Sequence, residues 1–210
     1  MAPAGIQHGA PNALRRGLHI KRLNALTAVL SGGVSGLALW ALFPRSPEGI
    51  ILGFLLGIFW ANGFEYIYHR WILHMTGGSF TRGHLDHHRA TGTPDEAEHV
   101  TFAESPLWIV AVFLINAVPV IVADRVFQVG IAPGMLLAFA LYYVAFEEIH
   151  WRMHLGEWLP HFLEPARAFH LSHHDRPDGR FNVFLPLFDW LLGTSRMPVW
   201  AGQGHARSSS

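Results

Sequence analysis

Four long apolar segments dominate the hydrophobic pattern of the chain. They cover residues 24–43, 49–64, 106–123 and 129–146, and each lacks Lys, Arg, Asp and Glu. A helix needs about 20 mostly apolar residues to cross the hydrocarbon core of a membrane. The four segments are close to that length, so the pattern predicts an all-α integral membrane protein with four transmembrane helices.

Short polar turns join these segments in two pairs. Residues 44–49 (PRSPEG) link the first two segments, and residues 124–128 (DRVFQ) link the last two. Turns this short predict two helical hairpins. Each hairpin returns the chain to the side of the membrane from which it started.

Glycines recur at intervals of four residues in the first two segments. Gly49, Gly53 and Gly57 form one series, and Gly32 and Gly36 form another. Small residues at this spacing allow two membrane helices to approach closely. We therefore expect helix contacts at these positions, although glycine in such segments is also common without any contact.

Positive charge is distributed unevenly between the two sides of the predicted hairpins. Of the 15 Lys and Arg residues, all but Arg45 and Arg125 lie before the first segment, between the hairpins or after the last segment. The positive-inside rule assigns that side to the cytoplasm. Both termini and every dense group of histidines are then cytoplasmic. We expect one membrane domain over residues 1–210, with flexible ends at 1–12 and 203–210.

Composition narrows the chemistry that the chain can carry. Half of the residues are hydrophobic, 14% are charged, and the formal net charge is zero, so nothing indicates a nucleic-acid partner. Cysteine is absent. Disulfides, iron–sulfur clusters and thiolate zinc sites are therefore excluded, and histidine and carboxylate remain as metal ligands.

Histidine is concentrated in four boxes, two after each predicted hairpin. The boxes read HRWILH, HLDHH, HWRMH and HLSHH, and their histidines are His69, His74, His84, His87, His88, His150, His154, His170, His173 and His174. The H-x-x-H-H spacing brings its three imidazoles to one side of a helical turn. Because one first-row ion takes at most about six donors, ten histidines predict a cytoplasmic helical cap that binds two metal ions.

Two glutamates stand one helical turn before a box. Glu147 precedes His150 and His154 on one face if the helix of 129–146 continues, and Glu65 stands four residues before His69. We expect each glutamate to ligate a metal or to accept a ring N–H from a ligating histidine. The alternative is that each glutamate is an ordinary charged residue of its helix, with no role at the site.

Box one has an unusual internal spacing. His74 follows His69 by five residues, which is about 140° around an ideal α-helix. The two rings are therefore predicted to diverge, a geometry that suits two metal ions better than one. Glu148, next to Glu147, is expected to face solvent.

Five histidines stand outside the boxes. His8, His19 and His205 are interpreted as ordinary polar residues, whereas His99 and His161 lie near the boxes and are left unassigned.

The ordered series H-x4-H, H-x2-H-H, H-x3-H, H-x2-H-H resembles the fatty acid hydroxylase superfamily. This is the membrane di-iron family that includes sterol desaturases and relatives of carotenoid hydroxylases. The resemblance covers residues 50–195 and includes FNVFLPLFDWLLGT at 181–194. It implies O₂-dependent hydroxylation or desaturation of a lipid at two iron ions held by the ten box histidines, with zinc as the other metal considered.

The substrate implied first is a fatty acid or a fatty-acyl lipid, and a sterol or carotenoid is the alternative. No GxGxxG fingerprint is present, so electrons are expected from a separate ferredoxin or from a cytochrome with its reductase. Arg152, Arg167, Arg176 and Arg180 could form a basic docking face for an acidic carrier. The positive-inside bias explains the same charges equally well.

The C-terminal apolar stretch, residues 181–194, is too short to span a membrane and is interrupted by Pro186 and Asp189. It is expected to form an interfacial helix that covers the metal site.

Two other functional classes would need residues in the spans that differ from those present. A haem electron carrier would place paired histidines inside the spans, and the four apolar segments contain none. A metal transporter would need polar or ionisable groups near the membrane midplane. The segments offer only the amides Asn24, Asn62 and Asn116 as candidates.

Overall fold

The computed structural model describes residues 11–43 and 46–195, and within these ranges it consists of helices and loops without a β-strand. Four helices are long and apolar enough to cross a membrane: Pro11–Leu42, Pro47–Leu73, Pro106–Phe127 and Ala132–His154. The predicted all-helical class is confirmed, and the four predicted spans correspond to these four candidate membrane helices. The two hairpins and the cytoplasmic orientation stay predictions.

The first long helix is built from α1 (Pro11–Ala28), a π-helical segment (Val29–Val34) and α2 (Ser35–Leu42). It begins well before residue 24, because the residues that precede the apolar segment are themselves helical and pack Gly17 against α5 (Glu96–His99). Residues 11 and 12 are thus helical, contrary to the flexible end predicted for 1–12. The remainder of that end, with His8, and the end at 203–210, with His205, lie outside the described residues.

The second long helix consists of α3 (Pro47–Ile67) and a π-helical segment, η2 (Tyr68–Leu73). Ser46 caps its start, where the Ser46 hydroxyl accepts a hydrogen bond of 3.2 Å from the backbone N–H of Gly49. The helix runs past the predicted end at residue 64 and therefore carries the start of box one.

The last two long helices are α6 (Pro106–Phe127) and α7 (Ala132–His154). At the turn between them, the carboxylate of Asp124 accepts a hydrogen bond of 2.7 Å from the backbone N–H of Ile131. Helix α7 continues from the apolar segment through box three to His154, as the sequence predicted.

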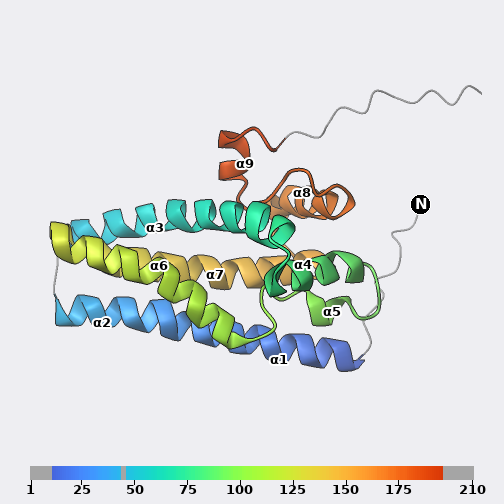
Figure 1. The fold of residues 1–210 in the computed structure, drawn as a ribbon, viewed down its shortest axis with the longest axis horizontal. Coiled ribbons are helices and arrows are strands. Elements are labelled where there is room, and N and C mark those ends of the chain that lie inside the picture. Colours follow the sequence, from blue (N-terminus) through green and yellow to red (C-terminus); the bar gives the residue numbers. More distant parts are fainter. Residues whose placement is uncertain (1–10, 44–45, 196–210) are drawn as a thin grey trace, which may run out of the picture.

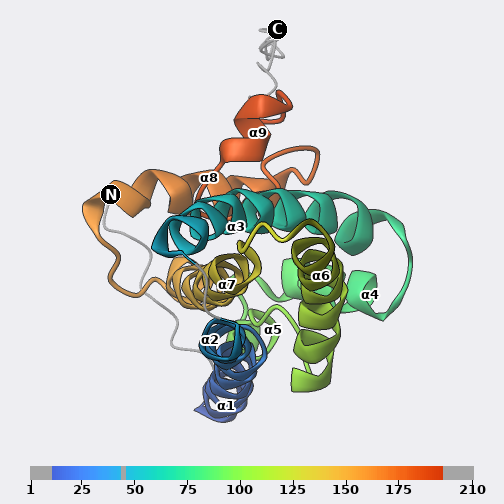
Figure 2. The same ribbon diagram turned by 90° about the vertical axis from the view of Figure 1, so that its left-hand side faces the viewer.

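Helix α7 is the centre of the bundle. It contacts α3, α2 and α6, and its interface with α3 is the most extensive in the described chain. Figure 1 shows these helices lying side by side along the long axis, and Figure 2, which views the bundle end-on, shows the other three around α7. The core is therefore built on one face of each outer helix, while the opposite faces expose apolar side chains such as Ile51, Leu55 and Ile115.

Glycines allow the backbones of α3 and α7 to approach each other closely. A Cβ atom added at Gly53 would lie 2.1 Å from the backbone oxygen of Ile131, and one added at Gly134 would lie 2.1 Å from the oxygen of Ile50. At Gly57, an added Cβ would lie 2.7 Å from the Cβ of Ala138. The contacts expected from the glycine spacing are present at Gly53 and Gly57.

Replacing Gly53 by alanine is expected to lower the stability of the purified protein by about 1–3 kcal/mol or more, the usual cost of an overpacked core. The new methyl group cannot avoid the backbone of Ile131 without separating α3 from α7. Thermal unfolding in detergent measures this. Gly33→Ala is the matched control, because a Cβ there meets only the Cγ1 of Val29 at 3.7 Å; equal stability of the two variants would contradict the role assigned to the interface.

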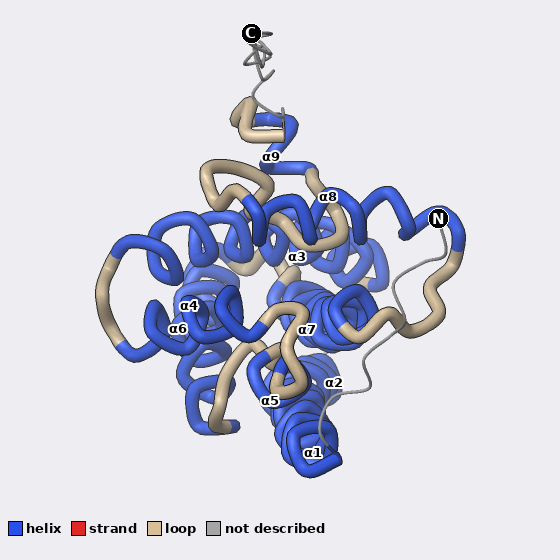
Figure 3. Tube along the Cα trace, turned by 90° about the vertical axis from the view of Figure 1, so that its right-hand side faces the viewer, coloured by secondary structure: helices blue, strands red, loops and turns tan. Residues whose placement is uncertain are grey.

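Shorter helices cover one end of the bundle. They are α4 (Ser79–Ala90), α5, the 3₁₀ segment η3 (His161–Leu163), α8 (Glu164–Asp175) and α9 (Leu187–Leu191). Figure 3 views this end and shows α4, α5 and α8 over the ends of the long helices. Box two lies on α4 and box four on α8, so all four boxes meet at this end.

Candidate metal centre

The ten box histidines form two groups of five. Within each group, one nitrogen from every ring lies within 4.8 Å of the corresponding nitrogens of the others. Cluster 1 contains His69, His74, His84, His88 and His173, and cluster 2 contains His87, His150, His154, His170 and His174. Each cluster thus combines residues from both halves of the chain.

Each H-x-x-H-H box is divided between the clusters. In box two, His84 and His88 belong to cluster 1 and His87 to cluster 2. Box four reverses this assignment, since His173 belongs to cluster 1 and its two neighbours in the box to cluster 2. Residues four apart on a helix share a face more closely than residues three apart do. Each box therefore contributes two rings to one cluster and one ring to the other. Both clusters thus contain histidines from α4 and from α8.

Box one departs from the prediction. His69 and His74 join the same cluster, and their ring centroids lie 5.2 Å apart in a stacked arrangement. The prediction of diverging rings assumed an α-helix, whereas Tyr68–Leu73 is π-helical. A π-helix joins residues five apart by its hydrogen bonds, so positions five apart lie one above the other.

The nitrogen geometry of cluster 1 fits a shared cation. The Nε2 atom of His84 lies 3.1 Å from that of His69, 3.1 Å from that of His74 and 3.0 Å from that of His88. One ring nitrogen has a single proton or a single lone pair, so it cannot hydrogen-bond to three others. With metal–nitrogen bonds of about 2.1 Å, two ligands at a right angle on one ion lie about 3.0 Å apart.

Cluster 2 has the same geometry. The Nε2 atom of His170 lies 2.9 Å from that of His154 and 3.2 Å from that of His174. Both ring nitrogens of His87 are buried without a hydrogen-bond partner, and its ring centroid is 4.5 Å from that of His154. A buried polar atom without a partner is costly, and a metal ion would supply one.

Four histidines have an acceptor or a hydroxyl at the nitrogen that faces away from the cluster. The Nδ1 atoms of His69 and His173 donate to the backbone oxygens of Phe181 at 2.5 Å and Gly179 at 2.7 Å. In cluster 2, His154 Nδ1 lies 2.8 Å from a carboxylate oxygen of Glu96, and His174 Nδ1 lies 3.0 Å from the hydroxyl of Thr91. A proton held at Nδ1 leaves the Nε2 lone pair for a metal.

Burial keeps these imidazoles uncharged. Desolvation lowers the pKa of His88 to about 4 and that of His173 to about 3. Burial likewise holds the pKa of His84 and of His87 well below the usual value. Neutral rings carry the lone pair that a metal ion needs.

Glu65 and Glu147 do not hydrogen-bond to a box histidine within the described residues. Glu65 accepts from the hydroxyl of Tyr142 at 2.5 Å and from the backbone N–H of Val183 at 2.7 Å. Glu147 accepts from the hydroxyl of Tyr143 at 2.7 Å and from the backbone N–H of Phe102 at 3.1 Å. Both carboxylates therefore join helices to loops that border the clusters.

Glu96 is the carboxylate that the sequence did not reveal. It lies on α5, outside the boxes and far in sequence from its partner His154, so spacing gave no signal for it. It also accepts a hydrogen bond of 2.8 Å from the backbone N–H of Gly92, which fixes the carboxylate against the loop. Glu96 thereby holds the ring of His154.

Replacing Glu96 by alanine is expected to weaken metal binding by cluster 2 by about 10–100-fold, the usual cost of losing the hydrogen-bond partner of a ligand. Competition with a chelator, followed by metal analysis of the protein, measures this. The control is Glu98→Ala, which removes a partly exposed carboxylate that pairs with Arg16 and belongs to neither cluster. Unchanged metal retention in Glu96→Ala would show that this carboxylate does not support a ligand.

The remaining expected residues lie apart from the clusters. Glu148 is 40% exposed and pairs with Lys21 and Arg152, in line with the solvent-facing position predicted for it. His19 and His161 are exposed. His99 lines the cavity next to the clusters but belongs to neither of them.

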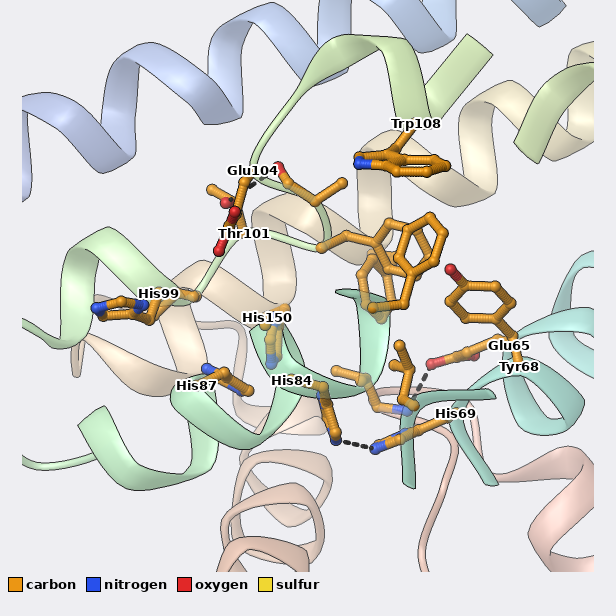
Figure 4. Close-up of a pocket in the computed structure, with 18 of the residues that line it drawn as sticks. Glu65, Tyr68, His69, His84, His87, His99, Thr101, Glu104, Trp108 and His150 are labelled. Carbon is orange, nitrogen blue, oxygen red and sulfur yellow. Dashed lines mark hydrogen bonds between the residues drawn. The ribbon is translucent and has the colours of Figure 1, made fainter. Parts of the chain in front are cut away.

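A cavity of about 90 Å³ adjoins both clusters. Figure 4 shows His69, His84, His87 and His150 along one side of it, with Thr101 across from them. The walls between them are largely apolar and aromatic and include Leu73, Phe80, Phe102, Trp108 and Phe146. An apolar molecule in this cavity would lie against imidazoles of both clusters.

The C-terminal segment covers the site mainly as a loop. Only Leu187–Leu191 is helical, because Asp189 is fully buried and binds the backbone N–H groups of Phe181 and Asn182 at 3.0 and 2.8 Å. The interfacial helix predicted over 181–194 is therefore reduced to five residues. The loop reaches cluster 1, where the ring centroid of Phe181 lies 5.7 Å from that of His173.

Most of the arginines proposed for a docking face bind within the chain. Arg152 pairs with Glu148, and Arg167 pairs with Glu164. Arg180 is buried and donates to the hydroxyl of Ser172. The docking of an acidic carrier on this face stays a prediction.

Comparisons with known proteins agree with this geometry. A family model described as fatty acid hydroxylase matches residues 23–194. The chain is 27% identical over 161 residues to the fatty acid 2-hydroxylase of Mus musculus, covering 70% of this chain and 41% of the relative. It is 27% identical over 174 residues to that of Rattus norvegicus, covering 74% and 44%. The chain thus spans less than half the length of these curated relatives. No solved structure matches it significantly.

Proposed function

Because the chain belongs to the fatty acid hydroxylase family, we propose that it hydroxylates a fatty acid or a fatty-acyl lipid with O₂ at a histidine-ligated centre of two iron ions. The observation that carries this proposal is the pair of five-histidine clusters beside an apolar cavity. Fatty acid 2-hydroxylase is the name of the two curated relatives. Hydroxylation is therefore favoured over desaturation, and a fatty-acyl substrate over a sterol or a carotenoid.

The donor set fits iron. Each cluster offers five neutral imidazoles, and imidazole suits iron as well as zinc. Two iron ions held there would supply the redox chemistry that reduces O₂ and breaks an unactivated C–H bond. Zinc cannot supply that chemistry, so we expect iron in the active protein.

The residues around the clusters orient the ligands and exclude water. The backbone oxygens of Gly179 and Phe181 and the carboxylate of Glu96 hold protons at Nδ1, so that Nε2 faces the centre. Phe102 and Phe146 form an apolar wall of the cavity. A dry wall keeps a hydrocarbon chain close to the centre and water away from the oxidising species.

We also propose a source of electrons and an orientation of the helix bundle in the membrane. The electrons come from a donor outside these residues, either a ferredoxin or a cytochrome with its reductase. The histidine-bearing end of the bundle faces the cytoplasm, as the distribution of Lys and Arg suggests. A donor then reaches the clusters without crossing the membrane.

The two other functional classes gain no support from the described residues. The intramembrane amides considered for a transport path are bound within the chain, since Asn62 donates to Tyr142 and Asn24 to the backbone oxygen of Ala103. A haem takes two axial ligands, whereas each cluster brings five imidazoles together. An oxidoreductase with a dinuclear centre accounts for both clusters.

Expression in cells together with a reductase system, under isotopically labelled O₂, tests the proposal. Mass analysis of the lipids is expected to show a fatty acyl group that has gained one labelled oxygen atom. Loss of two hydrogens without oxygen would assign the chain to desaturation instead. If sterols or carotenoids gained the labelled oxygen and fatty acids did not, the substrate assignment would be overturned.

A further inference from the structure

Three cavities follow one another from the histidine clusters into the membrane bundle. The largest adjoins both clusters, and a second cavity of about 30 Å³ shares Phe102 and Phe146 with it. A third of about 20 Å³ shares Phe139 with the second. Glu65 also lines both the first and the second cavity. The other residues shared between neighbouring cavities are aromatic, and rotation of such side chains can join the cavities.

The walls of the two inner cavities are almost entirely apolar. Helices α3, α6 and α7 all contribute to them, with Ala61 from α3, Val112 from α6 and Phe139 from α7. In Figure 2, α7 lies below α3 and beside α6, and it contacts both of them. An apolar space of this kind, next to the proposed reaction site, fits a hydrocarbon chain.

The inner end of the series is closed by a hydrogen-bonded bridge. The indole Nε1 of Trp60 on α3 donates to the side-chain oxygen of Asn116 on α6 at 2.9 Å. Both residues line the third cavity, together with Met135 on α7. The bridge joins α3 to α6 at this cavity, where it stands in the way of a chain that extends further between these helices.

The length of this path suits a long acyl chain. On α7, the interval from Met135 in the third cavity to His150 in the first covers about 22 Å, at a rise of about 1.5 Å per residue. That is close to the extended length of a long-chain fatty acid. A shorter chain would leave the inner cavity empty, and a longer one would meet Trp60.

Most polar side chains of the path stand at its outer end, and Asn116 at the inner end is bound to Trp60. Ser79, His99, Thr101 and Glu104 line the first cavity, whereas the second is lined by apolar and aromatic residues apart from Glu65. The polar end of a lipid is therefore best placed in the first cavity. A carbon near that polar end then lies beside the histidine clusters.

We propose that the acyl tail of the substrate lies between α3, α6 and α7, with its methyl end at the Trp60–Asn116 bridge, so that this bridge determines the chain length accepted. The inference rests on the proposed function, because it takes the first cavity as the site of reaction. It adds the residues that select the substrate and the direction in which the substrate lies. Oxidation near the polar end of the chain follows from that direction.

Two substitutions with opposite effects test the chain-length role. Val112→Phe fills the second cavity and is expected to lower the yield from stearate relative to laurate by about tenfold, since pocket shape discriminates methylene groups by about that much. Trp60→Ala opens the inner end and is expected to raise the yield from behenate relative to stearate. The control is Ile115→Phe, which adds the same ring on α6 at a side chain that is 68% exposed. Unchanged profiles in Val112→Phe and Trp60→Ala would overturn the inference.

A binding measurement separates this inference from the proposed function. Stearate carrying a photoreactive diazirine at its methyl end is bound to the purified protein in nanodiscs, irradiated and mapped by peptide mass analysis. Labelling near Trp60, Asn116 or Met135 is expected, and Trp60→Ala is expected to change the labelled positions. Labelling in these peptides without any hydroxylated product would refute the proposed activity alone. Hydroxylation with labels only in other peptides, on exposed residues such as Leu30 of the first long helix, would refute the tail path alone.

Discussion

Replacing His87 or His173 by alanine is expected to abolish hydroxylation and to leave about one metal ion per chain. His87 belongs to cluster 2 and His173 to cluster 1, although each is the second histidine of its H-x-x-H-H box. Loss of the hydrogen-bond partner of a ligand alone costs about 10–100-fold, so loss of a ligand is expected to lower activity by at least about 100-fold. Product analysis and metal analysis of the same preparations measure both effects.

The control for these variants is His19→Ala, because His19 is exposed on α1 and belongs to neither cluster. It is expected to keep full activity and full metal content. Full iron content and full activity in both His87→Ala and His173→Ala would contradict a dinuclear centre. Loss of both ions in one variant and of neither in the other would contradict the division of ligands between two clusters.

Replacing Glu65 by alanine is expected to lower the free energy of unfolding by about 3 kcal/mol or more, because each buried polar group left without a partner costs about 1–3 kcal/mol. The hydroxyl of Tyr142, the side-chain amide of Asn182 and the backbone N–H of Val183 would all lose their acceptor. The segment that begins at Phe181 would then keep its hydrogen bonds to Asn62 on α3 but lose those to Glu65. Thermal unfolding and the metal content of the purified variant test both consequences.

Glu148→Ala provides the comparison, since Glu148 is partly exposed and its ion pairs lie near the surface. Exposed pairs of this kind contribute about 0–1 kcal/mol, so we expect little change. If Glu65→Ala and Glu148→Ala were equally stable and retained the same metal content, the Glu65 network would not support the site.

The sequence predicted the membrane helices and the set of clustered histidines, because both depend on local patterns. Apolar length alone identifies a spanning helix, and spacings of three or four residues identify rings that share a helical face. These rules gave the ten histidines that the structure brings together at one end of the bundle.

Local patterns could not assign each histidine to a cluster. The exchange of His87 and His173 between the clusters depends on how α4 packs against α8, which is a long-range property. The joining of His69 and His74 depends on a π-helical segment, and an α-helical periodicity gives the wrong direction for His74. Spacing rules fail wherever the helix geometry that they assume changes.

The groups that hydrogen-bond to the ligating histidines could not be recognised from the sequence, for a related reason. Two of them are the backbone oxygens of Gly179 and Phe181, and backbone atoms leave no mark in a sequence. Glu96 is far from its partner His154 in the chain. The spacing of Glu65 and Glu147 suggested a role at the clusters. Their carboxylates instead accept hydrogen bonds from backbone N–H groups of loops and from tyrosine hydroxyls.

We propose that two iron ions are bound, one in each five-histidine cluster. Anomalous diffraction at the iron absorption edge, from crystals of the purified protein, tests it most directly. We predict two iron peaks, one among the Nε2 atoms around His84 in cluster 1 and one among those around His170 in cluster 2. A single peak, or peaks that appear only at the zinc edge, would contradict the account.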